Sequence, residues 1–449
     1  MKMKSSSSKS WFQKILPSPF ALAIILTFFS FLLALLFTSN PQSEQTYILE
    51  ILGFWQKGFW QLLTFAMQMI LMLVLGNVLA LTPVFKRLIL TIVKYTSNTS
   101  SSVVLVSLLS LILAYFNWGL SLILSALLAQ QIGIRAKEQN LKLNYPLIGA
   151  AAYSGLMVWH GGFSGSAPLK VAEKGHFLFD SIGQISISQT ILSPMNLKVM
   201  LASLLLIPLS FWILSRNKSA QDYDFHKITF EKPQDNTHTV SRIGAEKLDL
   251  ARWFSLVFGL IMLGVVLLGF IQKSALGLNI NSINMLLFGL SLMLYPNLRS
   301  FSKAVSTSIA SSSGIMIQFP LYAGIMGVMK YSGLTLVFTD WFIQISNPDT
   351  FPLFAMLSAG IVNFFVPSGG GQWAIQGPVL MEAAQSLHVS IPKTIMALAY
   401  GDELTNMLQP FWALPLLGIT KLKAREILPY SSIIFLVGIL IYGVALFFH

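Results

Sequence analysis

The 449 residues are 54% hydrophobic and only 10% charged, with a mean hydropathy of +0.69. Soluble domains carry about 25% charged residues, so this composition excludes a water-exposed globular protein and indicates an integral membrane protein. The net charge of +12 does not indicate nucleic-acid binding, because no basic cluster is interleaved with aromatic residues. The chain contains no cysteine, which excludes disulfides, thiolate metal sites and a cysteine nucleophile.

Apolar runs of a length that crosses a ~30 Å hydrocarbon core predict an all-α membrane fold. The first run, from Phe20 to Phe37, follows a lysine-rich N-terminus. It is long for a secretory signal and lacks a convincing cleavage site, so we interpret it as an uncleaved first span. We expect nine full spans, at residues 20–38, 58–81, 146–169, 196–215, 253–271, 281–297, 304–329, 395–419 and 428–448.

Two further apolar stretches, 101–133 and 351–381, are too long for one crossing. The first is interrupted by Asn117-Trp118-Gly119 and the second by the sequence VPSGGGQW at 366–373. A segment that enters the bilayer, turns at mid-depth and returns would account for both features. We therefore expect two re-entrant hairpins.

The distribution of Lys and Arg supports this topology and a cytoplasmic N-terminus. If 101–133 enters from the cytoplasm and 351–381 from outside, most basic clusters fall on the cytoplasmic side, as the positive-inside rule requires. Treating either hairpin as a single crossing inverts every later segment. Lys170 and Lys174 are an exception to this rule, since the topology puts them on the non-cytoplasmic side of the membrane. The loop 216–252 mixes seven Lys and Arg with six Asp and Glu, and we interpret it as a cytoplasmic linker.

A short internal repeat links the two halves of the chain, 1–215 and 253–449. At a constant offset of 247, the sequence AYSGLMVWHGGFSGSAPL at 152–169 matches AYGDELTNMLQPFWALPL at 399–416 in Ala, Tyr, Pro and Leu. Each segment follows a predicted hairpin, and an odd number of spans separates the hairpins. The sequence therefore predicts an inverted repeat, an architecture in which transporters place the substrate near the bilayer midplane.

The second hairpin carries the clearest candidate for a binding site. Irregular backbone at membrane depth is tolerated only inside protein or beside a water-filled cavity. If a helix begins at the three glycines, its free N–H groups and positive dipole end suit an anion. The candidate contacts there are Ser368, Gly369, Gly370, Gly371 and Gln372. The alternative interpretation is close helix packing by small residues.

The first half offers a counterpart in Asn117, Trp118 and Gly119. The sequence GGFSGSAP at 161–168 follows, and its glycines and serines should unwind the span at 146–169. We take Ser164, Gly165 and Ser166 as candidate contacts, although serines in helices also bond to the carbonyl of residue i−4.

Two carboxylates, Asp402 and Glu403, lie inside the expected span 395–419. A buried carboxylate is costly and functional by default, which favours Asp402 as a coupling group for a proton or another cation. A carboxylate facing a water-filled vestibule is the alternative. Asn406 and Gln409 should share its helix face. His160 is interpreted as a packing residue, and no metal-ligand spacing or catalytic triad accompanies it.

Six motifs closely resemble the bacterial short-chain fatty acid transporter family, the acetoacetate/butyrate permease type. They are FWxLLxFxMQM (59–69), NWG (117–119), GGFSGSxPL (161–169), IQFPLYAGI (317–325), NFxVPSGGGxWxIQGP (363–378) and NMxQPFWALP (406–415). The resemblance implies membership of a larger ion-transporter superfamily with paired hairpins in inverted repeats, often dimeric. Family members carry Gly at the position of His160, which implies that the shared mechanism does not require it. They carry Glu or Asp at 402, and Gln can stand at 403.

The resemblance predicts secondary uptake of a small monocarboxylate such as butyrate or acetoacetate across the inner membrane, coupled to a proton or sodium ion, with no cofactor. Trp118, Trp373 and Phe411 would enclose the alkyl tail. Three alternatives stay open: a passive small-anion channel, a carrier of a different small carboxylate, and an intramembrane enzyme that uses Asp402 or His160. No phosphate-binding GxxxxGK[ST] motif indicates ATP coupling.

Overall fold

The computed structural model describes residues 19–39, 46–216, 223–225, 244, 246–273 and 280–448, and all regular structure among them is helical. The helices of the first half are α2 (Pro19–Phe37), α3 (Tyr47–Phe59), α4 (Leu63–Ala80), α5 (Pro83–Val93), α6 (Thr99–Phe116), α7 (Trp118–Gln139), α8 (Tyr145–Tyr153), η1 (Ser154–Met157), α9 (Ser166–Lys170), α10 (Phe179–Ile182) and α11 (Pro194–Ser215). Those of the second half are α12 (Glu246–Leu250), α13 (Arg252–Lys273), α14 (Ile280–Leu294), α15 (Leu298–Ser308), η5 (Ile309–Ser312), α16 (Ser313–Tyr331), α17 (Leu334–Gln344), α18 (Phe351–Phe365), α19 (Gly369–Ser386), α20 (Ile391–Thr405), η6 (Asn406–Leu408), α21 (Pro410–Thr420) and α22 (Ala424–Phe448).

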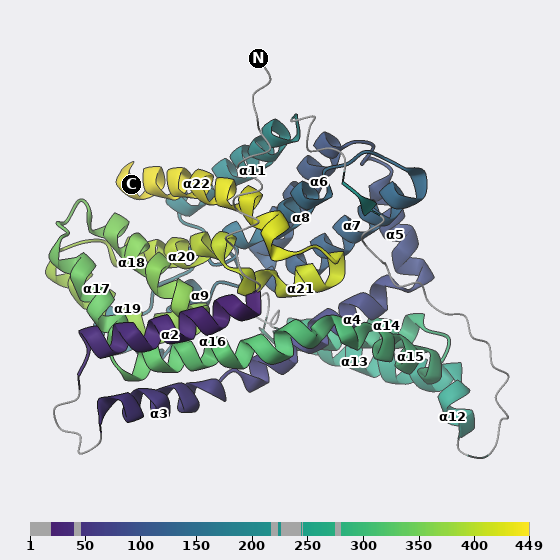
Figure 1. Ribbon diagram of the computed structural model, residues 1–449, viewed down its shortest axis with the longest axis horizontal. Helices are drawn as coiled ribbons and strands as arrows, with labels where there is room; N and C mark the ends of the chain where they lie inside the picture. The colour runs from purple at the N-terminus through teal and green to yellow at the C-terminus, as the bar shows by residue number, and fades with distance from the viewer. Residues whose placement is uncertain are drawn as a thin grey trace.

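The helices form two groups that are visible in Figure 1. Helices α2, α3 and α16 run side by side along one edge, and α4, α13, α14 and α15 continue this edge to the other end of the molecule. We call these seven helices the framework. The remaining long helices form the second group, which lies against the framework and in which α6 packs on α11 and α18 packs on α20. The short helices α8 and α21 and the start of α7 are buried within this second group. The interior of the second group is therefore where the irregular backbone is found.

The nine expected spans correspond only in part to single long helices. Among the described residues, six single helices (α2, α6, α7, α11, α13 and α22) are long and apolar enough to cross a membrane. The expected spans 58–81 and 304–329 are bent pairs, α3 with α4 at 40° and α15 with α16 at 58°, which raise the count to at most eight. The expected span 281–297 is the shorter helix α14. The lysine-rich N-terminus and most of the loop 216–252 lie outside the described residues.

Both predicted hairpins are helix–break–helix units that double back. In the first, the Ser121 hydroxyl donates to the Ser110 carbonyl at 2.6 Å, which joins α7 to α6. In the second, the Gln376 amide donates to the Ser358 hydroxyl at 2.8 Å, which joins α19 to α18. Helices α6 and α7 are about 27 and 33 Å long at about 1.5 Å per residue, so each is long enough to cross the hydrocarbon core. Re-entry therefore stays a prediction from the distribution of charge.

Two helices that follow the hairpins are interrupted inside the second group. The span expected at 146–169 unwinds as the sequence predicted, because α8 ends at Tyr153 and α9 begins at Ser166. The single span expected at 395–419 is wrong, since α20 ends at Thr405 and α21 begins at Pro410. Proline disfavours helical geometry in the residue before it, and Gln409 is accordingly extended, with φ −95° and ψ 121°.

Close helix crossings in the framework depend on glycine, and a matched pair of substitutions in α3 tests this. A Cβ atom at Gly58 would lie 2.5 Å from Gly327 Cα and 2.5 Å from the Ala323 carbonyl oxygen, all on the crossing of α3 with α16. Gly58→Ala should therefore destabilise the protein by about 1–3 kcal/mol through overpacking. Gly53 in the same helix has no atom within 4 Å of its Cβ position.

Gly53→Ala should leave the thermal unfolding temperature in detergent unchanged or raise it, since alanine favours helix by about 1 kcal/mol over glycine. Equal unfolding temperatures for the two variants would contradict the close crossing at Gly58.

Candidate functional site

The breaks in the two hairpins are ordered by side-chain caps. Asn117 is extended, and its side-chain oxygen accepts a hydrogen bond from the Leu120 N–H at 3.0 Å, which starts α7. Ser368 is likewise extended and accepts from the Gly371 N–H at 3.3 Å, which starts α19. Asn and Ser are favoured at this position because they satisfy an N–H that has no helical acceptor. Each hairpin therefore presents the beginning of a helix at its turn.

The unwound segment 158–165 of the first half lies against the first hairpin. The Phe163 N–H donates to the Tyr115 carbonyl at 2.7 Å, and a Cβ atom at Gly162 would lie only 2.3 Å from that oxygen. Only glycine fits such a close approach of two backbones. The Ser164 hydroxyl accepts from the Trp118 N–H at 3.1 Å. The predicted contacts Ser164 and Trp118 are thus brought together.

Two buried acidic side chains of α20 bind this segment from the second half. The Glu403 carboxylate accepts from the N–H groups of His160 at 2.8 Å and Gly161 at 3.3 Å. The Asp402 carboxylate binds Nδ1 of the His160 ring, and Nε2 of that ring accepts from the Ala167 N–H at 3.1 Å. His160 is fully buried, and both carboxylates are 1% exposed. His160 is therefore a hydrogen-bonded partner of Asp402 rather than a simple packing residue.

The first turn of α19 also lies beside the His160 ring and the Asp402 carboxylate. A Cβ atom at Gly369 would lie 2.8 Å from His160 Cε1 and 3.2 Å from the Asp402 carboxylate. The Cβ position of Gly370 lies 3.8 Å from the Ser166 hydroxyl. The turn of the second hairpin, the unwound segment of the first half and the acidic pair of α20 therefore meet around His160.

The second broken helix is held by an asparagine that the sequence interpretation did not select. The Asn363 side-chain amide donates to the Asp402 carbonyl at 2.7 Å, to the Thr405 hydroxyl at 2.9 Å and to the Asn406 side-chain oxygen at 3.0 Å. The Gln409 amide donates to the Asn363 carbonyl at 2.6 Å. The available signal was an amide side chain in an apolar run just before VPSGGG.

The predicted ligand contacts Gln372, Gly165 and Gly119 each bond to or pack against other parts of the protein. The Gln372 amide donates to the Ala359 carbonyl at 2.8 Å and to the Gln376 side chain at 2.9 Å, so it holds the second hairpin together. Gly165 packs against backbone, since a Cβ atom there would lie 2.0 Å from the His160 carbonyl. Gly119 packs on the side chain of Met72. Contact of these residues with a ligand stays a prediction.

Several buried polar atoms beside these breaks have no hydrogen-bond partner among the described residues. Such groups are rare in native proteins and commonly mark a ligand or water position. The hydrogen-bond donors are the indole N–H groups of Trp159, Trp373 and Trp412 and the Asn406 amide; the acceptors are side-chain oxygens of Asn363, Gln372 and Gln409.

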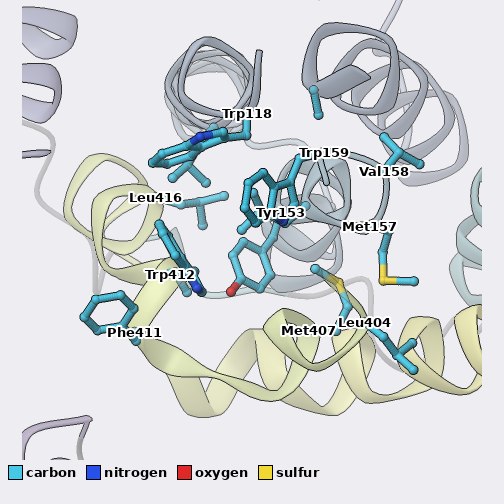
Figure 2. Packing of buried hydrophobic residues seen from close by; sticks show 14 of the residues in the cluster. Trp118, Tyr153, Met157, Val158, Trp159, Leu404, Met407, Phe411, Trp412 and Leu416 are labelled. Carbon is cyan, nitrogen blue, oxygen red and sulfur yellow. The ribbon is translucent and has the colours of Figure 1, made fainter. Parts of the chain in front are cut away.

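Three tryptophans form an aromatic cluster beside the breaks. The distance between ring centroids is 5.1 Å for Trp118 and Trp412, 6.1 Å for Trp118 and Trp159, and 6.4 Å for Trp159 and Trp412. Figure 2 shows these three rings grouped around Tyr153, with Phe411 beside Trp412. Trp373 instead packs on Phe177. Of the three aromatic residues expected around an alkyl tail, Trp118 and Phe411 therefore share one cluster.

Comparison with known proteins identifies the family. Residues 2–448 match the family model described as short chain fatty acid transporter. Two relatives carry the provisional name short-chain fatty acid transporter. The Haemophilus influenzae protein is 35% identical over 445 residues, covering 96% of each chain, and the Escherichia coli protein is 34% identical, covering 95% of this chain and 96% of its own.

Two solved structures are similar at a lower level. The YdaH transporter of Alcanivorax borkumensis is 15% identical, covering 95% of this chain and 98% of its own, with a TM-score of 0.42. MtrF of Neisseria gonorrhoeae is 14% identical, covering 98% of this chain and 97% of its own, with a TM-score of 0.41.

The match to the family model covers nearly the whole chain, and the apolar helices agree with it. The chain is therefore a multi-pass membrane transporter rather than an enzyme, and it belongs to the short-chain fatty acid transporter family.

Proposed function

We propose that this chain is a secondary transporter that takes up a short-chain monocarboxylate, such as butyrate or acetoacetate, across the bacterial inner membrane. The observation that carries the proposal is the meeting of the α19 helix start with Asp402 and the unwound segment of the first half. This arrangement supports the proposal because a helix N-terminus, which favours an anion, lies beside an ionisable group inside a membrane protein. The family and the names of the two relatives give the substrate class.

The substrate carboxylate would bind at the first turn of α19. The first N–H groups of a helix have no intrahelical acceptor, and the helix dipole is positive at this end, so the turn favours an anion. Gly369 and Gly370 leave that backbone unshielded, and Ser166 lies beside it. The indole N–H groups of Trp159 and Trp412 are further donors, and the aromatic cluster with Trp118 would enclose the alkyl tail.

Asp402 would couple uptake to a cation, which is a proton in our proposal and sodium in the alternative. Its carboxylate is buried, contacts the His160 ring of the first half and lies beside Gly369 at the turn of the second hairpin. A change in its charge would therefore alter its electrostatic interactions with both the unwound segment and the hairpin turn. The cytoplasmic N-terminus, the linker 216–252, the entry sides of the hairpins and the homodimer implied by the resemblance stay predictions.

The contacts of two tyrosines support the inverted repeat of 152–169 and 399–416. The Tyr153 hydroxyl donates to the carbonyls of Asn406 at 2.7 Å and Gln409 at 3.0 Å, which lie in the break of the second half. The equivalent Tyr400 hydroxyl donates at 2.9 Å to Asn196, whose amide donates at 2.8 Å to the Gly161 carbonyl in the break of the first half. Each copy thus supports the break of the other.

Uptake of labelled butyrate and acetoacetate into proteoliposomes tests the proposal. We expect saturable uptake that rises above equilibrium when an inward proton gradient is imposed, with little response to a sodium gradient. Accumulation driven only by sodium would replace the proton as the coupling ion. Flux that neither saturates nor accumulates would indicate a passive channel, and failure of both acids with uptake of a larger one would assign a different carboxylate.

A further inference from the structure

The hydrogen bonds around His160 fix which nitrogen of its ring carries the proton. The Ala167 N–H donates to Nε2 at 3.1 Å, so Nε2 is an acceptor and carries no hydrogen. A neutral imidazole then has its proton on Nδ1, which donates to the Asp402 carboxylate. In this structure His160 is therefore a neutral ring that joins α20 to the start of α9.

Addition of a second proton to this ring would break one of the two contacts. A protonated imidazole donates from both nitrogens and accepts at neither. The Nε2–H and the Ala167 N–H would then point at each other, while the contact of Nδ1–H with Asp402 would gain opposite charges. Ala167, at the end of the segment 161–167, would therefore have to move away from the ring. Ser164, which lies in this segment, accepts the Trp118 N–H at the turn of the first hairpin.

The ionisable groups around His160 come from α20 and α22. Asp402 contacts the ring, whereas Glu403 accepts from the backbone N–H of His160. Tyr400 of α20 and Tyr442 of α22 lie behind Glu403. The first turn of α19 presents only glycine to the ring.

We propose that His160 is a protonation switch. Its neutral form binds Ala167 at the end of the segment 161–167, and its protonated form breaks this one contact and loosens that end of the segment while remaining paired with Asp402. The inference deepens the proposed proton coupling and rests on it for its role in transport. The switch itself can be measured without any substrate, so its failure and the failure of the uptake proposal are distinguishable.

Thiol labelling of the full-length protein in detergent tests this loosening of the segment. The chain contains no cysteine, so Ser164→Cys introduces a single thiol. Its maleimide labelling rate is divided by that of Ser188→Cys, an exposed position, because thiolate reactivity itself falls with pH. When the pH is lowered from about 7.5 to 5.5, we expect the ratio to rise. The rise should be about fivefold, the effect of losing a hydrogen bond worth about 1 kcal/mol.

Two substitutions of His160 and one control decide the result. His160→Gln and His160→Asn cannot gain a proton in this range, and in either background the labelling ratio should not change with pH. His388→Asn removes an exposed imidazole whose φ is 58°, a conformation that asparagine tolerates, and it should keep the wild-type response. A pH-dependent ratio that persists in both His160 variants, or no change in the wild-type background, would overturn the proposal.

A second measurement uses the ring that stacks on His160. The centroids of Trp159 and His160 lie 4.6 Å apart at an interplanar angle of 21°, so a protonated ring should quench the emission of Trp159. On acidification of the otherwise unmodified protein we expect a reversible loss of emission on the order of a tenth, since Trp159 is one of ten tryptophans. The loss should vanish in His160→Gln. An unchanged loss in that variant, or in Trp159→Phe, would contradict protonation of His160.

Discussion

Replacing Gly369 with alanine should lower substrate uptake much more than the same change at the next residue, Gly370. A Cβ atom at position 369 would lie 2.8 Å from His160 Cε1, 3.0 Å from Trp159 Cη2 and 3.2 Å from the Asp402 carboxylate. At position 370 the nearest atom, the Ser166 hydroxyl oxygen, is 3.8 Å away, an ordinary contact.

The atoms around Gly369 cannot move aside cheaply. The His160 ring is bound at both nitrogens, by Asp402 and by the Ala167 N–H, and it stacks on Trp159. An added methyl group must therefore displace either the α19 turn or the His160–Asp402 contact. Overpacking of this kind costs about 1–3 kcal/mol, which corresponds to roughly a five- to 150-fold loss if transport needs the undisturbed arrangement.

The two variants are matched controls for each other, because both residues lie in the first turn of α19 and gain the same helix preference. The measurement is the initial rate of labelled butyrate uptake into proteoliposomes, at equal protein content and with unfolding temperatures recorded. Equal loss in both variants would mean that the backbone freedom of the turn matters rather than its contact with His160. Equal retention would place the α19 turn outside the transport site.

Sequence alone could predict the breaks in the hairpins, because their signals are local. Three consecutive glycines after Pro367 and an asparagine cap at Asn117 disfavour a continuous helix wherever the chain runs. The break at Gln409 was equally local, since Gln409-Pro410 marks a helix start, but the apolar residues on both sides led to a single span. The missed signal was thus present and was outweighed by hydropathy.

The partners across the repeat could not be predicted in the same way. His160 and Asp402 are 242 residues apart, and nothing in either local sequence specifies the other. The sequence favoured Asp402 and assigned no role to Glu403, which accepts two backbone N–H groups of the unwound segment. Asn363 was unselected because its three acceptors appear only once α18 packs on α20. Contacts of this kind follow from tertiary packing, which a single sequence does not contain.

Asp402→Asn should eliminate accumulation of substrate against its gradient while leaving the protein folded. The amide has the shape of the carboxylate, and its oxygen can still accept from Nδ1 of His160, so the packing around α19 is retained. The amide cannot carry a negative charge or take up a proton, so the group proposed to couple transport to the cation is lost. Labelled butyrate should then reach the same concentration inside and outside the vesicles, whatever proton gradient is imposed.

The neighbouring Glu403 supplies the control for this second prediction, because it is just as buried and has the same carboxyl group. In Glu403→Gln the amide oxygen can still accept from the N–H groups of His160 and Gly161, so accumulation should persist. In Glu403→Ala both buried N–H groups lose their acceptor, at about 1–3 kcal/mol each, so the unfolding temperature should fall. Two adjacent carboxylates would then have separate tasks, with Asp402 coupling transport and Glu403 stabilising the unwound backbone. Loss of accumulation in Glu403→Gln, with Asp402→Asn still active, would reverse that assignment and move the coupling group one residue along α20.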